Sequence, residues 1–326
     1  MTEVAAKKPS LRRWILRLLG PLGLVWVIYR LDRPAAVLDL LARAEWWLVG
    51  LALLLNVVNV ELKVERWRLL LRERGIEYDR VRARVAFLSS SYAGFVTPGR
   101  VGDVLRAEYL RREKGVAWHE GVLSVVVDRV CDVAALGLCV ALALFHLRNV
   151  VTPEIARIGW ILVGATAVGT VVFVALSVRG KGAGPGAEST NLSIRSVIQK
   201  LQSYHPRALA IPMALTLVTF GVTFLQGFMM ARAIGVPISF LDVSALLSAA
   251  SFLSLLPISI SGVGIREALF AVVFPQRGFS ADAGVALGIL VFGVIYGGVA
   301  LLGLLAWVVR PPSVPGEGSL PSEGRP

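Results

Sequence analysis

Charged residues are scarce in this sequence. Asp, Glu, Lys and Arg make up only 17% of the 326 residues, whereas hydrophobic residues make up 56% and the mean hydropathy is +0.69. A soluble domain carries about 25% charged residues and about 45–50% apolar ones. This shortage of charge excludes a secreted enzyme, a Rossmann-type enzyme, a disordered protein and a nucleic-acid-binding domain. The formal charge of +12 instead fits basic loops that face anionic lipid headgroups, so the sequence predicts an integral membrane protein.

Cysteine and histidine are also rare. Cys131 and Cys139 lie eight residues apart in one apolar stretch. A helical rise of about 1.5 Å per residue separates them by about 12 Å, which is too far for a disulfide bond. The three histidines add too few ligands for a structural zinc site. The sequence contains no Walker-type Gly-Lys-Ser/Thr motif and no nucleophile–base triad, so we expect no metal, no cofactor and no ATP-driven pump activity in this chain.

What the sequence does contain is long apolar stretches, six of which read as full crossings of a bilayer at about 20 residues each. Tryptophan lies at several of their edges, as is typical of the membrane interface. Two further apolar stretches, 86–98 and 243–261, are too short or too interrupted to cross. The six predicted spans are 14–29, 46–60, 120–147, 158–178, 208–233 and 283–309.

Lysine and arginine divide the connecting segments into two groups. Four segments are rich in both, and the positive-inside rule places them in the cytoplasm together with both chain termini. Apolar 86–98 lies between two of these segments, so it must enter the membrane and return to the same side. Stretch 243–275 lies between two loops that contain few basic residues, so it enters from the opposite face. The basic segments are the N-terminus, 61–85, 99–119 and 179–207.

These patterns predict an all-α polytopic membrane protein with about six transmembrane helices and two re-entrant helical hairpins of opposite orientation, in two inverted, pseudo-symmetric halves. Segment 61–85 mixes apolar and basic side chains, which favours an amphipathic helix on the membrane surface; a plain cytoplasmic loop helix is the alternative. The predicted domains are a basic cytoplasmic N-terminus at 1–13, a transmembrane domain at 14–309 with halves at about 14–147 and 158–309, and a disordered cytoplasmic tail at 310–326.

Each predicted hairpin contains a helix break. Pro98 and Gly99 interrupt the first hairpin and Pro257 the second, in each case between a Ser-rich apolar helix and a charged helix start. Proline and glycine end one half-helix and free the backbone for the next. Irregular backbone at membrane depth is tolerated only where it lines a cavity or is buried in protein. Paired interrupted segments in two halves of a chain indicate a transporter substrate site, although both could also be plain loop connections.

The residues around these breaks suit an anion. Half-helix N-termini near Gly102 and Gly264 offer backbone N–H groups and a positive dipole end, and arginines add permanent charge. In a membrane the obvious anion is a phosphate or pyrophosphate headgroup, which arginine binds with two parallel hydrogen bonds. A simple cytoplasmic surface position is the alternative for Arg106. The predicted substrate-binding residues are Arg100, Gly102, Asp103, Arg106, Gly262, Gly264, Arg266 and Glu267.

Three charged residues lie inside the third predicted span. Counted from Glu120 at about 1.5 Å per residue, Asp128 and Asp132 lie about 12 and 18 Å along the helix, within the hydrocarbon. The two acids share a helix face at i,i+4 spacing, and Arg129 meets Asp132 at i,i+3 spacing. Each unpaired charge at the bilayer centre costs about 2.5–3.5 kcal/mol on insertion scales, so the three must pair or line an aqueous path. A functional site and an internal salt bridge that locks helices together both fit this cluster.

Three motifs together resemble the membrane region of lysylphosphatidylglycerol synthases and of stand-alone flippase-like membrane proteins: Thr97–Arg106, Val127–Arg129 with Asp132, and Gly262–Glu267. The resemblance covers about 14–309 and implies a lipid-translocating domain with two opposed re-entrant helices. In the synthases a soluble C-terminal domain transfers lysine from aminoacyl-tRNA to lipid. This chain ends at Pro326, so we do not expect that activity.

The chain also departs from the resembling sequences within its last span. They tend to carry an arginine where this chain reads Val294–Gly298, so the last span offers no charge partner for the central acids. The Pro-Gly pair of the family at the second break is altered as well, to Pro257 followed by Ile258.

Three functions compete at this point. The leading hypothesis is a lipid transporter, or flippase-like protein of the cell membrane, that moves or binds an anionic phospholipid or a polyprenyl-phosphate-linked lipid. The alternative is a non-transporting accessory subunit of a membrane glycosyltransferase or lipid-modifying enzyme. An enzyme that uses Asp128 and Asp132 as acid and base is the third, and it lacks a nucleophile or metal cluster. The expected partners are membrane lipids and, for the alternative, a separate enzyme, with no nucleic acid.

Overall fold

The computed structural model describes residues 29, 34–149, 153–179, 206–255 and 263–310, and these residues form helices and no strand. The predicted all-α class is therefore confirmed for this part of the chain. Several predicted features lie outside the described residues: the N-terminal domain, almost all of span 14–29, almost all of segment 179–207, Pro257, Gly262 and the tail after Arg310.

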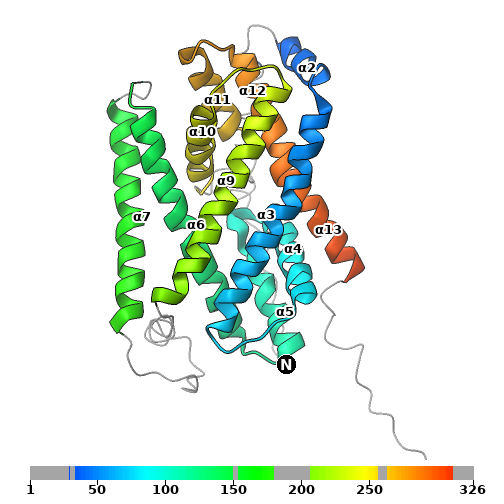
Figure 1. The fold of residues 1–326 in the computed structure, drawn as a ribbon, viewed down its shortest axis with the longest axis vertical. Coiled ribbons are helices and arrows are strands. Elements are labelled where there is room, and N and C mark those ends of the chain that lie inside the picture. Colours follow the sequence, from blue (N-terminus) through cyan, green and yellow to red (C-terminus); the bar gives the residue numbers. More distant parts are fainter. Residues whose placement is uncertain (1–28, 30–33, 150–152, 180–205, 256–262, 311–326) are drawn as a thin grey trace, which may run out of the picture.

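Long helices run along the molecule in Figure 1. Three of those described are long and apolar enough to cross a membrane: Trp46–Arg72, Ala210–Ala233 and Ala281–Val309. They overlap three predicted spans, and α6 and α7 occupy two more, while the total of six spans stays a prediction. The long elements are α3 (Trp46–Arg72), α6 (Trp118–His146), α7 (Pro153–Arg179), α9 (Ala210–Ala233), which follows the short η2 (Pro206–Leu209), and the continuous run of α12 (Ala281–Val291), the π-helical η3 (Phe292–Gly297) and α13 (Gly298–Val309).

The surface helix predicted for 61–85 is wrong. Helix α3 continues without a break to Arg72, and a second helix begins at Arg80. Apolar side chains of α3 recur at helical spacing, and Val60, Val64 and Trp67 lie in a buried cluster with residues of neighbouring helices. The amphipathic face that suggested a membrane surface therefore packs inside the protein.

Two pairs of half-length helices occupy opposite ends of the molecule. In Figure 1, α4 (Arg80–Val96) and α5 (Leu105–Lys114) lie in the lower half, joined by the 3₁₀ segment η1 (Pro98–Val104). Helices α10 (Phe240–Leu253) and α11 (Ile265–Gln276) lie in the upper half, near the short α2 (Pro34–Ala42). This placement agrees with two hairpins of opposite orientation, and their position relative to a membrane stays a prediction.

The two halves repeat local backbone structure at a separation of 160 residues. Gly75 and Gly235 end α3 and α9 with φ of 71° and 72°. The next N–H closes the same turn in each half, from Ile76 to Leu71 O and from Val236 to Ala231 O, both at 3.0 Å. A left-handed glycine with this hydrogen bond is the usual way to end a helix.

The helix starts repeat at the same separation. Asp79 caps α4 and Ser239 caps α10, each by accepting a hydrogen bond from a backbone N–H of the first turn, and these N–H groups lower the pKa of the Asp79 carboxyl. Helices α5 and α11 then begin at Leu105 and Ile265, again 160 residues apart.

Helices α3 and α9 exchange contacts reciprocally. Arg66 Nη1 donates to Thr216 Oγ1 at 2.9 Å. Gln226 Nε2 donates to Asn56 Oδ1 at 3.0 Å. Gln226 occupies in α9 the place of Arg66 in α3, and Thr216 that of Asn56, because both pairs are 160 residues apart. The crossing of α3 and α9 therefore lies on a pseudo-twofold axis, which supports the predicted pseudo-symmetric arrangement.

Candidate functional site

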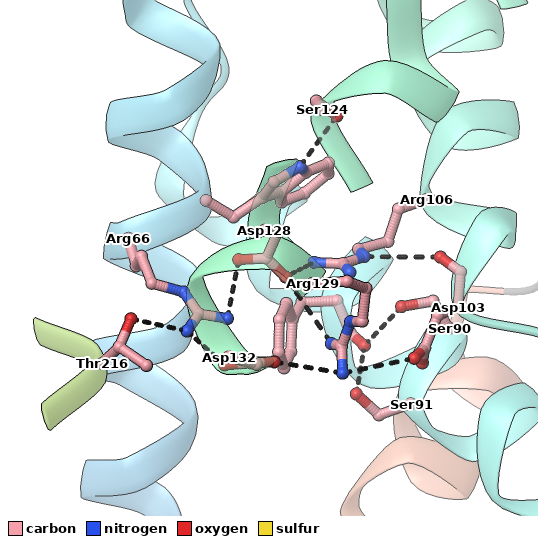
Figure 2. Close-up of polar contacts among 12 residues, drawn as sticks. Arg66, Ser90, Ser91, Asp103, Arg106, Ser124, Asp128, Arg129, Asp132 and Thr216 are labelled. Carbon is pink, nitrogen blue, oxygen red and sulfur yellow. Dashed lines mark hydrogen bonds and ion pairs between the residues drawn. The ribbon is translucent and has the colours of Figure 1, made fainter. Parts of the chain in front are cut away.

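Six charged residues form one network in the interior, which we call the charge network (Figure 2). Helix α3 contributes one arginine, η1 one aspartate, α5 one arginine, and α6 two aspartates and an arginine. The network therefore contains three arginines and three aspartates. They are Arg66, Asp103, Arg106, Asp128, Arg129 and Asp132.

Asp128 is the centre of the charge network. Its Oδ1 lies 2.7 Å from Arg66 Nη2 and its Oδ2 lies 3.0 Å from Arg106 Nη1, and its side chain is fully buried. Removing an ion from water costs several kcal/mol even after relaxation, so a carboxylate at this depth requires close partners. The two arginines supply them from α3 and α5, so the ion pairs join three helices.

Arg66 is the network residue that sequence reasoning missed. It is fully buried, and its Nη1 donates to Asp132 Oδ1 at 2.5 Å as well as to Thr216. It was grouped with the basic segment 61–85, whose other arginines do lie toward the helix ends. The available signal was its position beside Trp67, within the apolar stripe of α3. With Arg66 present, the central acids do not need an arginine from Val294–Gly298.

Arg106, one of the predicted substrate-binding residues, is also buried. Its guanidinium carbon lies 5.2 Å from the centre of the Trp67 ring and 4.9 Å from that of Phe87. Together with its ion pair to Asp128 and a 3.4 Å hydrogen bond to the carbonyl of Asp103, these contacts enclose the charge. The cytoplasmic surface position considered for Arg106 is wrong, and Arg106 stabilises the network from inside.

Arg129 differs from the other two arginines. Its side chain is 32% exposed, and its carboxylate contacts are longer: 3.1 Å to Asp132, and 3.6 Å each to Asp103 and Asp128. The predicted contact between Arg129 and Asp132 is confirmed. Figure 2 shows the guanidinium between Asp132 on one side and Asp103 on the other.

A cavity of about 720 Å³ lies beside Arg129. Residues of η1, α6 and α7 line it, together with Phe252 of α10. Valine predominates, and the polar side chains are few. The lining side chains that carry polar groups are Asp103, Arg129, Thr166 and Thr170. The site is therefore an apolar cavity with one exposed cation at its wall.

The first helix break approaches α4 closely. Thr97 Oγ1 donates to the carbonyl of Ala93 at 2.7 Å and accepts the N–H of Gly102 at 2.9 Å. A Cβ at Gly102 would lie 2.2 Å from the carbonyl carbon of Ala93, so only glycine fits. The N–H that sequence reasoning assigned to an anion is thus bound to Thr97. Pro98 and Gly99 begin η1 as predicted helix breakers, and of Arg100 only the backbone is described.

The predicted residues of the second hairpin have partners outside the charge network. Arg266 is buried, with its guanidinium carbon 4.5 Å from the centre of the Tyr296 ring and its Nη1 3.8 Å from Glu267 Oε1. Glu267 Oε2 accepts the N–H of Gly264 at 2.7 Å. These described contacts differ from those of Arg106, and the role of Arg106, Arg266 and Glu267 in substrate binding stays a prediction.

The described part of the chain shows no cluster of three His, Cys, Asp or Glu side chains that could hold a metal ion. The acids of the charge network face arginines instead. Cys131 and Cys139 are both free thiols, in agreement with their predicted separation.

Comparison with known proteins agrees with this geometry. Residues 14–303 match the family described as the lysylphosphatidylglycerol synthase TM region. The chain belongs to this family. The match covers both hairpins and the whole charge network, and with the apolar helices it makes the chain a multi-pass membrane protein.

One curated relative of this family member is a glycosyltransferase, AglD of Haloferax volcanii. It is 29% identical over 170 residues, which make up 49% of this chain and 27% of the relative. The aligned part thus spans about a quarter of the length of AglD.

Proposed function

We propose that this protein binds an anionic lipid in the cavity beside Arg129 and moves it across the cell membrane. The supporting observation is the cavity itself, with a volume of about 720 Å³, mostly apolar walls and an arginine that is 32% exposed. Binding sites for small ligands combine apolar walls with a few polar groups at defined positions, which fix the orientation of the ligand. An acyl or isoprenoid chain fits the apolar part, and a phosphate fits the arginine.

The arrangement of the hairpins supports transport rather than static binding. One half-length pair lies at each end of the molecule, and η1 of the first pair contributes Val101, Asp103 and Val104 to the cavity wall. Interrupted helices that reach a substrate site from both sides are typical of secondary transporters. The proposal places both chain termini in the cytoplasm.

The proposed function contains no catalytic step. Both carboxylate oxygens of Asp128 already face arginines, which disfavours acid–base work on a headgroup. A second candidate is a non-transporting accessory subunit of a lipid-modifying enzyme. The similarity to part of a glycosyltransferase favours it, because the aligned region is a minor share of that protein.

Transport can be tested with two glycines of α7. A Cβ at Gly169 or at Gly164 meets no atom within 4 Å, but only Gly169 lines the cavity. Gly169→Leu should therefore fill the cavity, whereas Gly164→Leu adds the same side chain outside it. The measurement is translocation of fluorescent phosphatidylglycerol in proteoliposomes that contain the full chain, followed by quenching of the outer leaflet.

We expect the parent and Gly164→Leu to translocate the lipid and Gly169→Leu to be at least several-fold slower. Equal translocation rates for both variants would show that the lipid does not pass through the cavity. No translocation by the parent, with stable capture of a lipid-modifying enzyme by the same protein, would favour the accessory subunit.

A further inference from the structure

The three arginines of the charge network are not equally available. Arg66 and Arg106 are at most 1% exposed, and their closest carboxylate oxygens lie at 2.5–3.0 Å. Arg129 is 32% exposed, and two of its three carboxylate contacts are 3.6 Å long. A charge-assisted N–H···O bond is normally about 2.7–2.9 Å, so Arg129 is paired more weakly than the other two.

Arg129 also has a hydrogen-bond donor that is not used. Its buried Nε–H finds no acceptor among the described residues. Arg129 is one of the residues that line the cavity, together with Asp103 and the valines of η1 and α6. Arginine is the side chain whose planar fork binds a phosphate through two parallel bonds.

We propose that Arg129 is the phosphate-binding residue of the cavity, and that it binds the phosphate of an amphiphile by exchanging it for the carboxylate of Asp132. This inference rests on the proposed function, because it takes a lipid as the occupant of the cavity. In this proposal Arg129 recognises the phosphate headgroup, and the headgroup displaces the carboxylate of Asp132.

After this exchange both acids of α6 still contact an arginine. Asp132 keeps its 2.5 Å contact with Arg66 when Arg129 turns away. Asp128 likewise keeps Arg66 and Arg106. Breaking a buried ion pair is costly when one charged partner stays buried without the other. Asp132 is 24% exposed, which lowers that cost further.

The ligand must carry an apolar part as well as the phosphate. Beyond Arg129 and Asp103 the cavity presents valine, leucine and phenylalanine side chains with two threonines. A free phosphate would lose its hydration there and gain only one cation, whereas an alkyl phosphate also buries its chain. We therefore assign the site to lipid phosphates rather than to inorganic phosphate.

Variants with opposite expected effects test the exchange. Asp132→Asn removes the competitor and should bind a phosphate amphiphile several-fold more tightly than the parent. Arg129→Gln removes the receptor and should bind it about tenfold or more weakly, since charge-assisted hydrogen bonds are lost. The double variant Arg129→Gln/Asp132→Asn keeps the buried charges balanced, so it should fold and bind as weakly as Arg129→Gln. Arg111→Gln, at an exposed position of α5, is the control for overall charge.

The measurement is calorimetric titration of the purified full chain in a neutral detergent with dodecyl phosphate, dodecanol and inorganic phosphate. We expect dodecyl phosphate to bind at least tenfold more tightly than the other two. If Asp132→Asn and Arg129→Gln both weaken binding, Arg129 acts only in holding the network together and the proposal fails. If inorganic phosphate binds as tightly as dodecyl phosphate, the site belongs to a free anion and the proposal fails as well.

The result is separable from the transport test. Arg129-dependent binding of dodecyl phosphate with no translocation by the parent would overturn the proposed transport and keep the phosphate site. Translocation blocked by Gly169→Leu, with dodecyl phosphate binding that does not depend on Arg129, would keep the transport and overturn the phosphate site.

Discussion

The two halves of this protein share a scaffold but differ in charge. Arg106 and Arg266 occupy equivalent positions, one residue into α5 and α11. The first half also carries Arg66, Asp128 and Asp132. In the second half, Gln226 lies 160 residues after Arg66, and residues 283–297, in the helix run that follows the second hairpin, include no charged side chain.

The partner of each hairpin arginine shows what this difference does. Arg106 pairs with an acid on another helix, so the first half is held together by ion pairs between helices. Arg266 lies near Glu267, its own neighbour in sequence. A Cβ at Gly288 would lie 2.9 Å from Glu267 Cγ, so Glu267 packs directly against α12. The comparison teaches that the scaffold is duplicated while the charge network lies in the first half.

The largest expected difference between the halves is the side of the membrane from which a cysteine can be labelled. A cysteine that replaces Arg112, at the end of α5, should react with a membrane-impermeant thiol reagent only from the cytoplasmic side. One that replaces Arg277, just after α11, should react only from the other side, because lysine and arginine are distributed asymmetrically. Labelling of intact and opened cells, in a chain without Cys131 and Cys139, makes the comparison. Reaction of both cysteines from one side would contradict the predicted opposite orientation of the hairpins.

The next largest effect concerns the acids of α6. Asp128→Ala leaves Arg66 and Arg106 without their shared carboxylate and should cost about 3–5 kcal/mol of stability. Asp132→Ala should cost less, because each arginine that it contacts keeps another acid. Glu120→Ala, at the start of the same helix, removes a partly exposed pair with Arg74 and should cost about 0–1 kcal/mol. Thermal unfolding in detergent orders the three variants, and equal losses would contradict the central position of Asp128.

A smaller difference is expected between the equivalent arginines. Arg106→Lys keeps the charge but loses the planar contacts with Trp67 and Phe87 and the guanidinium geometry toward Asp128, which should cost about 1.5–3 kcal/mol. Among the contacts that the structure describes, Arg266→Lys loses one ring contact and a 3.8 Å approach to Glu267, from which we expect a smaller cost. Arg277→Lys serves as a control in the second half for both stability and translocation. A larger loss for Arg266→Lys would assign the second hairpin a role that its local contacts do not indicate.

The smallest effect should be equal in the two halves. Gly75 and Gly235 have the same positive φ and open space around a Cβ. Replacing either by alanine should therefore cost about 1 kcal/mol, from backbone strain alone. Unequal costs, measured by unfolding in denaturant, would show that the two helix ends are less equivalent than their geometry.

Much of the fold could be predicted from the sequence because its physical signals are local. Apolar length located the helices at 46–60, 208–233 and 283–309, and Pro98 with Gly99 located the first break. The i,i+3 spacing of Arg129 and Asp132 predicted their contact, since both lie on one helix. The 160-residue spacing is not visible in the sequence, because the equivalent positions share turns, helix caps and helix starts more than they share residue types.

The candidate site was harder to predict because its contacts join distant segments. The basic segment 61–85 predicts a surface position for Arg66, because nothing in the neighbouring sequence distinguishes a buried arginine from the exposed ones around it. Its partners Asp128, Asp132 and Thr216 follow it by 62, 66 and 150 residues. Arg106 was misplaced for the same reason. Only the packing of α3, α5 and α6 decides which of the many basic residues are enclosed.

The reciprocal crossing of α3 and α9 has the form of a homodimer interface within a single chain, where residue i contacts j and j contacts i. A true homodimer would have to bury every charge twice, once in each copy. A chain with two unlike copies can bury each charge once and carry a neutral side chain at the equivalent position, as Gln226 does at the position equivalent to Arg66. The joining of both copies in one polypeptide is therefore what permits a single, one-sided charge network in an otherwise symmetric frame.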